Sequence, residues 1–158
     1  MSIAIGASLP SAELHEGTPG NPVDPAEAFA TGKHIVFAVP GAFTPGCSKT
    51  HLPGYIEQAD ALKAKGIASI ACISVNDAFV MDAWGQAHGA GGKVRMLVDP
   101  QGAFTQALGL EVQAAALGGL RSKRYAMVVE NGTVTDLQVE PDGFGLSCSL
   151  APELLGRL

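Results

Sequence analysis

The sequence predicts an α/β fold, in which a central mixed β-sheet is flanked by helices on both faces. Apolar runs typical of buried strands alternate with segments of helical periodicity over the first two thirds of the chain. Asn131-Gly132, a strong hairpin signal, joins two further apolar runs. Because the alternating units predict parallel strands and the hairpin adds an antiparallel pair, the predicted sheet is mixed.

The composition predicts one folded domain over residues 1–158. Hydrophobic residues make up 47% of the chain and charged residues 16%, which excludes the disordered proteins of low hydrophobicity and high charge. A net charge of −5 argues against a nucleic-acid partner, because phosphates are bound by a surplus of Lys and Arg. The apolar runs are too short to span a bilayer, so no membrane partner is expected.

The first predicted strand covers His34–Val39, after an opening stretch rich in Pro and Gly that predicts extended segments and turns. A Pro/Gly turn over residues 40–46 follows it. Apolar residues at helical spacing then predict a helix that ends near Gly66. Pro53 should kink this helix or separate a short first helix from a longer one, because proline lacks the N–H that a helix interior needs.

The rest of the chain continues the alternation. Asn76-Asp77 can cap a second long helix, whereas residues 109–119 show no clear pattern. This order is typical of the thioredoxin-like fold, in which a reactive thiol stands where the first helix begins. The further elements are predicted as strands over 67–75 and 94–98, helices over 79–87, 103–108 and 152–158, and hairpin strands over 125–129 and 133–139.

The chain has three widely spaced cysteines, Cys47, Cys72 and Cys148. An odd number in a chain of this length is not the pattern of a secreted disulfide framework. No CxxC occurs, so neither a zinc ribbon nor a dithiol oxidoreductase is indicated, and no metal or other cofactor is expected. What remains is the chemistry of a single thiol, or of two thiols that folding brings together.

Cys47 lies just after a strand and a turn, at the expected first turn of the first long helix. The partial positive charge of a helix N-terminus stabilises a thiolate, which is the nucleophilic form. Thr44 can place its hydroxyl beside the sulfur, and Pro40 and Pro45 can shield it from water. The alternative is an ordinary buried cysteine in an ordinary turn. The candidates for a neighbouring cation are Arg95, Arg121 and Arg124.

The string Pro40-Gly-Ala-Phe-Thr-Pro-Gly-Cys47 fits the PxxxTxxC motif of peroxiredoxins, and the longer string over 39–54 resembles the peroxiredoxin 5 branch. Further strings agree, in order, over 71–80, 124–129 and 139–148. The resemblance covers nearly the whole chain from about Ile5 and is weakest over 108–122. That segment is shorter than in relatives and rich in small residues, which leaves the preference for bulky peroxides open.

The resemblance implies a role for each residue of the motif. Cys47 matches the peroxidatic cysteine, whose thiolate attacks a peroxide and becomes a sulfenic acid. Arg124 matches the arginine that polarises the peroxide, and Thr44 matches the residue whose hydroxyl contacts sulfur and peroxide. Pro40 matches the residue that screens the thiol. The implied peroxide-binding set is Thr44, Pro45, Gly46, Cys47 and Arg124, with the N–H groups of Gly46 and Cys47 as donors.

Cys148 matches the resolving cysteine of the atypical two-cysteine type, which forms an intramolecular disulfide with Cys47 that thioredoxin reduces. The substrates implied are hydrogen peroxide and small alkyl hydroperoxides. Two alternatives stay open: a one-cysteine peroxidase reduced through glutathione or glutaredoxin, and a redox sensor whose oxidised thiol alters binding. The family also implies a monomer or a weak homodimer.

The remaining predictions are structural or concern location. Cys72, in mid-strand, should pack as a small buried hydrophobe. His51, four residues after Cys47, should hydrogen bond near Thr44 or to a neighbouring backbone group. No leader is visible, which predicts a cytoplasmic protein or, if a leader was removed, a mitochondrial or other organellar one. The final Arg157-Leu158 matches the last two residues of a peroxisomal address, although Gly156 does not fit it.

Overall fold

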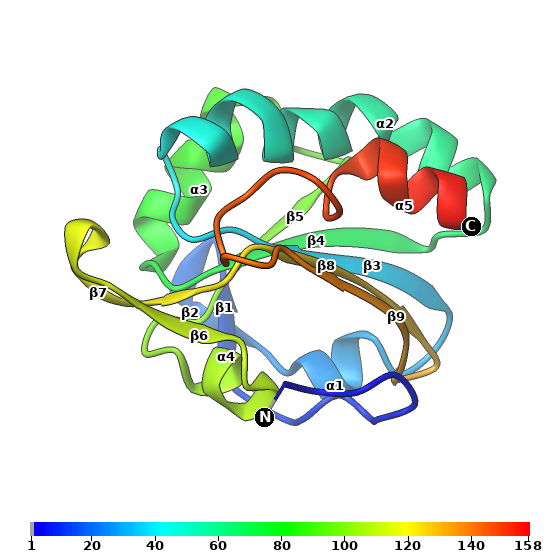
Figure 1. Cartoon of the computed structure of the whole chain (residues 1–158), viewed down its shortest axis with the longest axis horizontal. Coiled ribbons are helices and arrows are strands. Elements are labelled where there is room, and N and C mark those ends of the chain that lie inside the picture. Colours follow the sequence, from blue (N-terminus) through cyan, green and yellow to red (C-terminus); the bar gives the residue numbers. More distant parts are fainter. Residues whose placement is uncertain (1) are drawn as a thin grey trace.

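The computed structural model describes residues 2–158 and contains a seven-stranded mixed sheet in the order β2-β1-β5-β4-β3-β8-β9 (Figure 1). The three central strands β5, β4 and β3 are parallel, and β8 runs antiparallel to β3. The strands of this sheet are β1 (Leu14–Glu16), β2 (Thr18–Val23), β3 (Lys33–Ala38), β4 (Ser69–Ser74), β5 (Arg95–Val98), β8 (Tyr125–Glu130) and β9 (Thr133–Val139).

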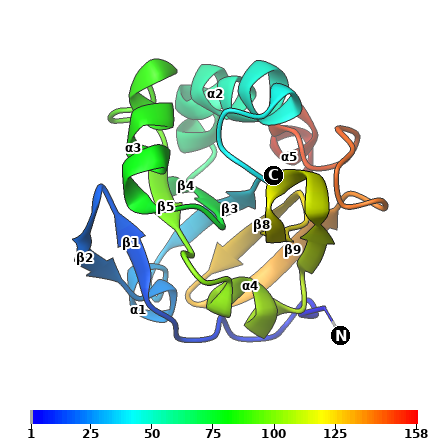
Figure 2. The ribbon, with the colours of Figure 1, turned by 90° about the vertical axis from the view of Figure 1, so that its left-hand side faces the viewer.

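Helices cover both faces of the sheet, as the sequence predicts (Figure 2). On one face lie α2 (Leu52–Ala64), α3 (Ala78–Ala87) and α5 (Ala151–Arg157). On the other lie α1 (Pro25–Ala28) and α4 (Ala103–Leu108). No helix within residues 2–158 is long and apolar enough to cross a membrane.

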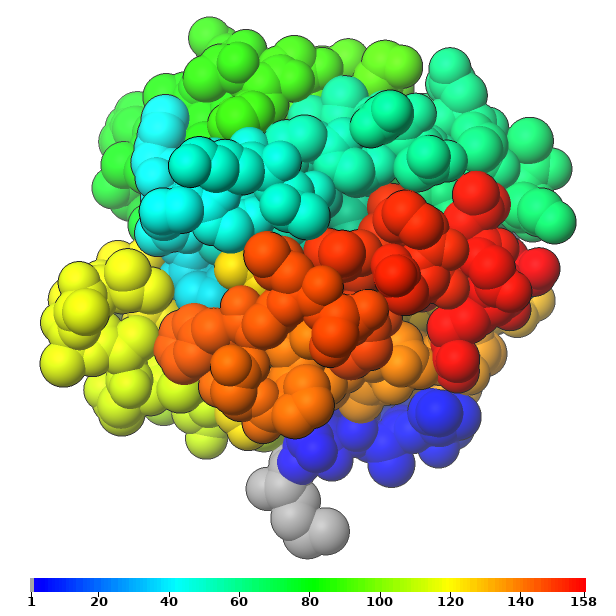
Figure 3. Space-filling view, turned by 45° about the horizontal axis from the view of Figure 1, so that its top comes forward, coloured from blue at the N-terminus to red at the C-terminus, as the bar shows by residue number. Residues whose placement is uncertain are grey.

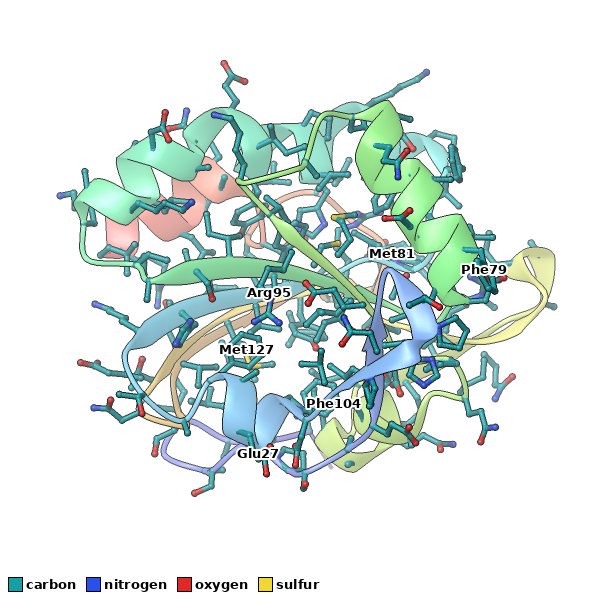
Figure 4. The ribbon with its side chains drawn as sticks, turned by 180° about the vertical axis from the view of Figure 1, so that it is seen from behind. Glu27, Phe79, Met81, Arg95, Phe104 and Met127 are labelled. Atoms are coloured by element: carbon teal, nitrogen blue, oxygen red, sulfur yellow. The ribbon has the colours of Figure 1, made fainter. Side chains whose placement is uncertain are left out.

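The central strands are buried on both faces, which explains why they appear in the sequence as continuous apolar runs. In β3, Ile35 and Phe37 contribute to the core beneath α2, while Val36 belongs to the core beneath α4. Phe104 of α4 and Met127 of β8 lie in this second core (Figure 4). The fold is therefore an α/β sandwich of the thioredoxin-like class, with one hydrophobic core on each side of the sheet.

The β8–β9 hairpin forms where the sequence predicts it. Asn131 and Gly132 have φ angles of 51° and 80°, the left-handed conformation that a two-residue type I′ turn requires. Glycine adopts this conformation without strain and asparagine tolerates it. The Asn131 side chain also accepts a hydrogen bond from the Gly32 N–H at 2.9 Å, which ties the turn to the start of β3.

Two regions differ from the sequence prediction. The Pro/Gly-rich start forms the hairpin β1–β2, and β1 extends the sheet by pairing antiparallel with β5. The patternless segment 109–119 contributes to a second hairpin, β6 (Glu111–Ala114) and β7 (Gly119–Ser122), joined by a short 3₁₀ turn, η2 (Ala115–Leu117). Both hairpins are short, so their apolar periodicity is too brief to identify them.

Pro53 lies in the second position of α2, directly after a π-helical turn, η1 (Cys47–His51). The Leu52 N–H donates to the carbonyl of Cys47, five residues back, so the turn is wider than an α-helical one. Proline has no N–H to donate to the carbonyl four residues before it, which favours this widening. The sequence alternative of a short first helix joined to a second therefore describes the structure better than a kink.

Candidate active site

The register of three strands brings three distant segments to one edge of the sheet. Ala38 of β3 pairs with Tyr125 of β8, and Tyr125 pairs in turn with Val139 of β9. The loop to Cys47 leaves the sheet just after Ala38, Arg124 directly precedes Tyr125, and Glu140 directly follows Val139. The pairing of these three strands therefore brings the loop to Cys47, Arg124 and Glu140 together at one site.

The loop between β3 and Cys47 is held by hydrogen bonds to the next strand and within itself. The Val39 N–H donates to the carbonyl of Ile73 at 3.1 Å, and the Ala42 N–H donates to the Asn76 side chain at 3.1 Å. The Thr44 hydroxyl donates to the carbonyl of Gly41 at 2.7 Å. These bonds fix where the helix that follows begins.

Cys47 is the first residue of the π-helical turn and is fully buried. Arg124 Nη2 donates to its sulfur at 3.3 Å. Of the three arginines that the sequence offers as neighbours, Arg124 is thus the one beside the thiol. Arg95 instead makes a two-point ion pair with Glu16, at 3.0 and 3.1 Å. The guanidinium places a permanent positive charge and a hydrogen-bond donor in contact with the sulfur.

The Arg124 guanidinium is held through all three of its nitrogens. Besides the bond to Cys47, Nε donates to the carbonyl of Phe144 at 3.2 Å and Nη1 donates to His51 Nδ1 at 3.0 Å. Only 4% of this residue is exposed. A Cβ on Gly46 would lie 3.2 Å from Nη2, so the glycine allows the guanidinium to approach the helix start closely. The planar guanidinium of Arg124 is therefore held against the sulfur in one fixed orientation.

His51 is completely buried and links Arg124 to the backbone of Ser149. Its Nε2 lies 3.1 Å from the carbonyl of Ser149. A carbonyl oxygen only accepts, so Nε2 carries the proton and Nδ1 is free to accept from Arg124. Burial and the Arg124 charge lower the pKa of His51 to about 3, so the ring is neutral at physiological pH. His51 thus makes the expected hydrogen bond to a backbone group, the carbonyl of Ser149. Its second hydrogen bond, to Arg124, was not expected from the sequence.

The other predicted residues of the motif lie around this centre. Thr44 is half-buried, and its hydroxyl hydrogen is used on Gly41, which leaves the oxygen able to accept. In the part of the chain that the structure describes, no hydrogen bond joins Thr44 to the Cys47 sulfur, and the contact of its hydroxyl with sulfur and peroxide stays a prediction. Pro40 is buried, whereas Pro45 is exposed, so only the first is placed to exclude water from the interior.

Cys148 belongs to a segment that we call the Cys148 loop, residues 144–149. Figure 3 shows residues 140–150 (orange) packed against the segment that carries Cys47 (cyan). The Cys148 thiol is half-buried and donates to the carbonyl of Val139 at 3.4 Å. Burial and the nearby Glu140 carboxylate raise its pKa. Cys47 and Cys148 are both free thiols in this structure.

Glu140 is a residue of the site that no sequence pattern identifies, and its carboxylate accepts hydrogen bonds from Ser147, Cys148 and Ser149. Burial opposes its ionisation, but these hydrogen bonds outweigh burial and lower the pKa of Glu140 to about 2. Its only sequence signal is an acid at a strand end, seven to nine residues before a Ser-Cys-Ser string. That pattern is too general to identify a contact.

The third cysteine and the remaining polar groups suggest no further reactive centre. Cys72 is fully buried in β4, and burial raises the pKa of its thiol, as expected for a packing residue. Within residues 2–158, no three or more His, Cys, Asp or Glu side chains gather in a way that could hold a metal ion. The chemistry available is that of one buried thiol held against a guanidinium, with a second thiol on the neighbouring loop.

Three comparisons relate this chain to known proteins. The Redoxin family profile matches residues 4–147. Peroxiredoxin-2E-2, chloroplastic, of Oryza sativa subsp. japonica is 46% identical over 165 residues, which cover 99% of this chain and 73% of that protein. The crystal structure of reduced Prx3 in complex with hydrogen peroxide from Vibrio vulnificus matches with a TM-score of 0.93 at 52% identity, over 99% of both chains. Peroxiredoxin 5 from Alvinella pompejana matches with a TM-score of 0.85 at 39% identity, over 99% of both chains.

Proposed function

The chain belongs to the redoxin family and is a peroxiredoxin of the peroxiredoxin 5 type, a thiol peroxidase, and from this premise we propose that it reduces hydrogen peroxide and small alkyl hydroperoxides at Cys47. The observation that carries the proposal is the contact of Arg124 Nη2 with the Cys47 sulfur at 3.3 Å in a buried site. The V. vulnificus structure was determined with hydrogen peroxide bound, which supports this substrate class for a chain 52% identical to it.

In the first step, the Cys47 thiolate attacks one peroxide oxygen. A sulfur–oxygen bond forms, the O–O bond breaks, and the leaving oxygen takes a proton to become water or an alcohol. Sulfur is oxidised by two electrons and becomes a sulfenic acid. Negative charge develops on the leaving oxygen, and the fixed guanidinium of Arg124 stabilises that charge.

The neighbouring groups would orient the peroxide. The Thr44 hydroxyl donates its hydrogen to the carbonyl of Gly41, so its oxygen can accept a hydrogen bond from the peroxide O–H group. The N–H groups of Gly46 and Cys47, at the start of the helix, can donate to peroxide oxygens, because the first N–H groups of a helix have no intrahelical acceptor. Pro40, the buried first residue of the turn, would limit the access of water.

In the second step, the Cys148 thiolate attacks the Cys47 sulfur. A disulfide forms, the sulfur–oxygen bond breaks, and the oxygen leaves as water after taking a proton. A thiol reductant such as thioredoxin would then reduce the disulfide to two thiols. The position of Cys148 supports this step, since its loop supplies the carbonyl groups that hold Arg124 and His51.

Intact-mass analysis tests the proposal directly. The fully reduced protein is treated with one equivalent of hydrogen peroxide without reductant and then mapped by peptides. We expect the loss of two hydrogens with Cys47 linked to Cys148, and the addition of one oxygen at Cys47 in Cys148→Ser. One oxygen on Cys47 in the unsubstituted protein would favour the one-cysteine route through glutathione or glutaredoxin. No rapid change would overturn the proposal.

Turnover separates the enzyme from a sensor. With thioredoxin, its reductase and NADPH, we expect sustained peroxide consumption. Oxidation that stops after one equivalent despite thioredoxin or glutathione would favour a redox sensor. A monomer or weak homodimer and an organellar or cytoplasmic location stay predictions; the rice relative is named chloroplastic.

A further inference from the structure

Glu140 gathers an unusual number of hydrogen bonds from the Cys148 loop. Its carboxylate accepts from the N–H groups of Ser147, Cys148 and Ser149, at 3.0, 2.9 and 2.8 Å. It also accepts from the hydroxyls of Ser147 and Ser149, at 2.6 and 2.7 Å. A carboxylate offers about four acceptor positions, so these donors use its whole capacity. The residue is 1% exposed, which keeps water from competing for these bonds.

The loop that Glu140 holds also supports the peroxide site. The carbonyl of Ser149 accepts from His51 Nε2 at 3.1 Å and from the Tyr55 hydroxyl at 2.7 Å. The carbonyl of Phe144 accepts from Arg124 Nε at 3.2 Å. One carboxylate therefore fixes the segment whose carbonyls orient Arg124, both directly and through His51.

The two thiols are free in this structure, and each is held by a different group. The Cys148 N–H is bonded to Glu140 and its thiol to the carbonyl of Val139, while the buried Cys47 sulfur is bonded to Arg124. A disulfide requires the two sulfurs at about 2.05 Å and the two Cβ atoms at about 3.8 Å. Forming the disulfide therefore requires the Cys148 thiol to leave the Val139 carbonyl and the Cys47 sulfur to leave Arg124.

We propose that Glu140 is a positioning residue that latches the Cys148 loop closed, which orders Arg124 for peroxide reduction and lowers the fraction of molecules open for disulfide formation. The inference rests on the proposed two-cysteine mechanism. While the loop is closed, the sulfenic acid of Cys47 is exposed to a competing reaction with a second peroxide. In that reaction sulfur gains one oxygen to become a sulfinic acid, the O–O bond breaks, and an alcohol or water leaves. The strength of the latch thus sets the ratio of disulfide to sulfinic acid.

Two variants separate the latch from the charge of Glu140. Glu140→Gln removes the charge and turns an amide NH₂ towards backbone N–H groups, which can only donate, so the loop loses hydrogen bonds. Its uncharged side chain also favours the Cys148 thiolate, which by itself would speed the disulfide step. Ser149→Ala removes one donor to the latch and leaves the carboxylate and its charge in place. Glu153→Gln, an exposed acid in the first turn of α5, is the control for losing one negative charge near the loop.

The measurement is the ratio of disulfide to sulfinic acid at Cys47, by quenched mass spectrometry, over a series of hydrogen peroxide concentrations at pH 6, 7 and 8. In Glu140→Gln we expect the peroxide concentration that gives equal amounts to rise about tenfold, in line with the loss of hydrogen bonds to a charged group. In Ser149→Ala we expect a rise of about threefold, in line with one lost hydrogen bond. Both variants should also react more slowly with the first peroxide, because Arg124 loses support. Glu153→Gln should stay within about twofold of the unsubstituted protein.

The outcomes distinguish this inference from the proposed function. If the unsubstituted protein forms the disulfide but neither variant changes the ratio, or both lower it, the latch is overturned and the two-cysteine mechanism stands. The latch is also overturned if two results occur together. The ratio of disulfide to sulfinic acid in Ser149→Ala equals that of the unsubstituted protein, and the pH dependence of this ratio in Glu140→Gln is only shifted along the pH axis. If the unsubstituted protein forms no disulfide, the latch and the two-cysteine mechanism are both overturned. Should Glu140→Gln not fold by circular dichroism, Ser149→Ala and Ser147→Ala decide.

Discussion

Two loops leave the same edge of the sheet and each carries a cysteine, but the charges that surround the two thiols are opposite. Cys47 is fully buried and receives a hydrogen bond from the Arg124 guanidinium. Cys148 is half-buried beside the Glu140 carboxylate, which together with burial raises the pKa of its thiol. A cation thus lies beside Cys47 and an anion beside Cys148, and the anion disfavours the thiolate form of Cys148. The difference suggests why one thiol would react with peroxide first and the other would act later.

The largest effect is expected from removing the Arg124 guanidinium beside Cys47. Arg124→Gln should slow the reaction of the reduced protein with hydrogen peroxide by about 10²–10³-fold, because one fixed donor to the developing charge is lost. Trp84, the only tryptophan, donates to the Ser48 hydroxyl at 2.9 Å next to Cys47, so stopped-flow fluorescence should report the reaction.

Arg121→Gln is the matched control, since Arg121 donates to the carbonyl of Leu117 rather than to the sulfur. Its rate should stay within about threefold of the unsubstituted protein, as for a group that stabilises no developing charge. Equal losses in both variants would mean that positive charge in the region, and not the oriented donor, supports the reaction.

The second prediction concerns the anion beside Cys148. Because the pKa of the Cys148 thiol is raised above its ordinary value, only a small fraction is thiolate at neutral pH, and this fraction grows as pH rises. Disulfide formation should therefore accelerate by about tenfold per pH unit between pH 6 and 8, provided that loop opening is a rapid pre-equilibrium. Quenched-flow mass spectrometry after one equivalent of peroxide measures this rate. A rate independent of pH would show that opening of the loop, and not the thiolate fraction, limits the step.

The third prediction tests the neutral histidine that joins the two loops. The pKa of His51 is about 3 in the folded protein, while an exposed histidine titrates near 6.5, so only the unfolded chain gains this proton between the two values. The contribution of His51 to stability is present above about pH 6.5 and is lost as pH falls towards 3, by up to about 1.4 kcal/mol per pH unit. His51→Gln should remove this slope from urea unfolding measured between pH 7 and 4.

Tyr55→Phe is the control, because it removes the other donor to the Ser149 carbonyl without adding or removing a group that titrates in this range. It should lower stability at every pH by about 1 kcal/mol and keep the slope. A slope that survives in His51→Gln would assign the acid sensitivity to other groups.

The smallest effect is expected at the third cysteine. Cys72→Ala removes a buried sulfur from β4 and should lower the free energy of unfolding by about 1 kcal/mol, while peroxide reduction is unchanged. Denaturant unfolding and the stopped-flow assay measure the two quantities. A large loss of activity would mean that Cys72 takes part in the chemistry, in conflict with its fully buried position.

Local patterns determined much of the fold before the structure was known. The apolar runs identified β3, β4 and β5, the periodicity identified α3 and α4, and Asn131-Gly132 identified the β8–β9 turn. These features depend on a few neighbouring residues, so a single sequence contains them. The short hairpins β1–β2 and β6–β7 were not predicted, because their strands are too brief for periodicity and gain stability from packing.

The sequence by itself also determined that Cys47 stands between a Pro/Gly turn and a helix start, since a strand, a turn and a helix start are all local features. Which groups surround that thiol is decided by the tertiary structure. Arg124 lies 77 positions from Cys47, and Glu140 was not identified at all. The physical reason is strand register: the pairs Ala38–Tyr125 and Tyr125–Val139 set these distant residues in one row, and no local pattern encodes that alignment.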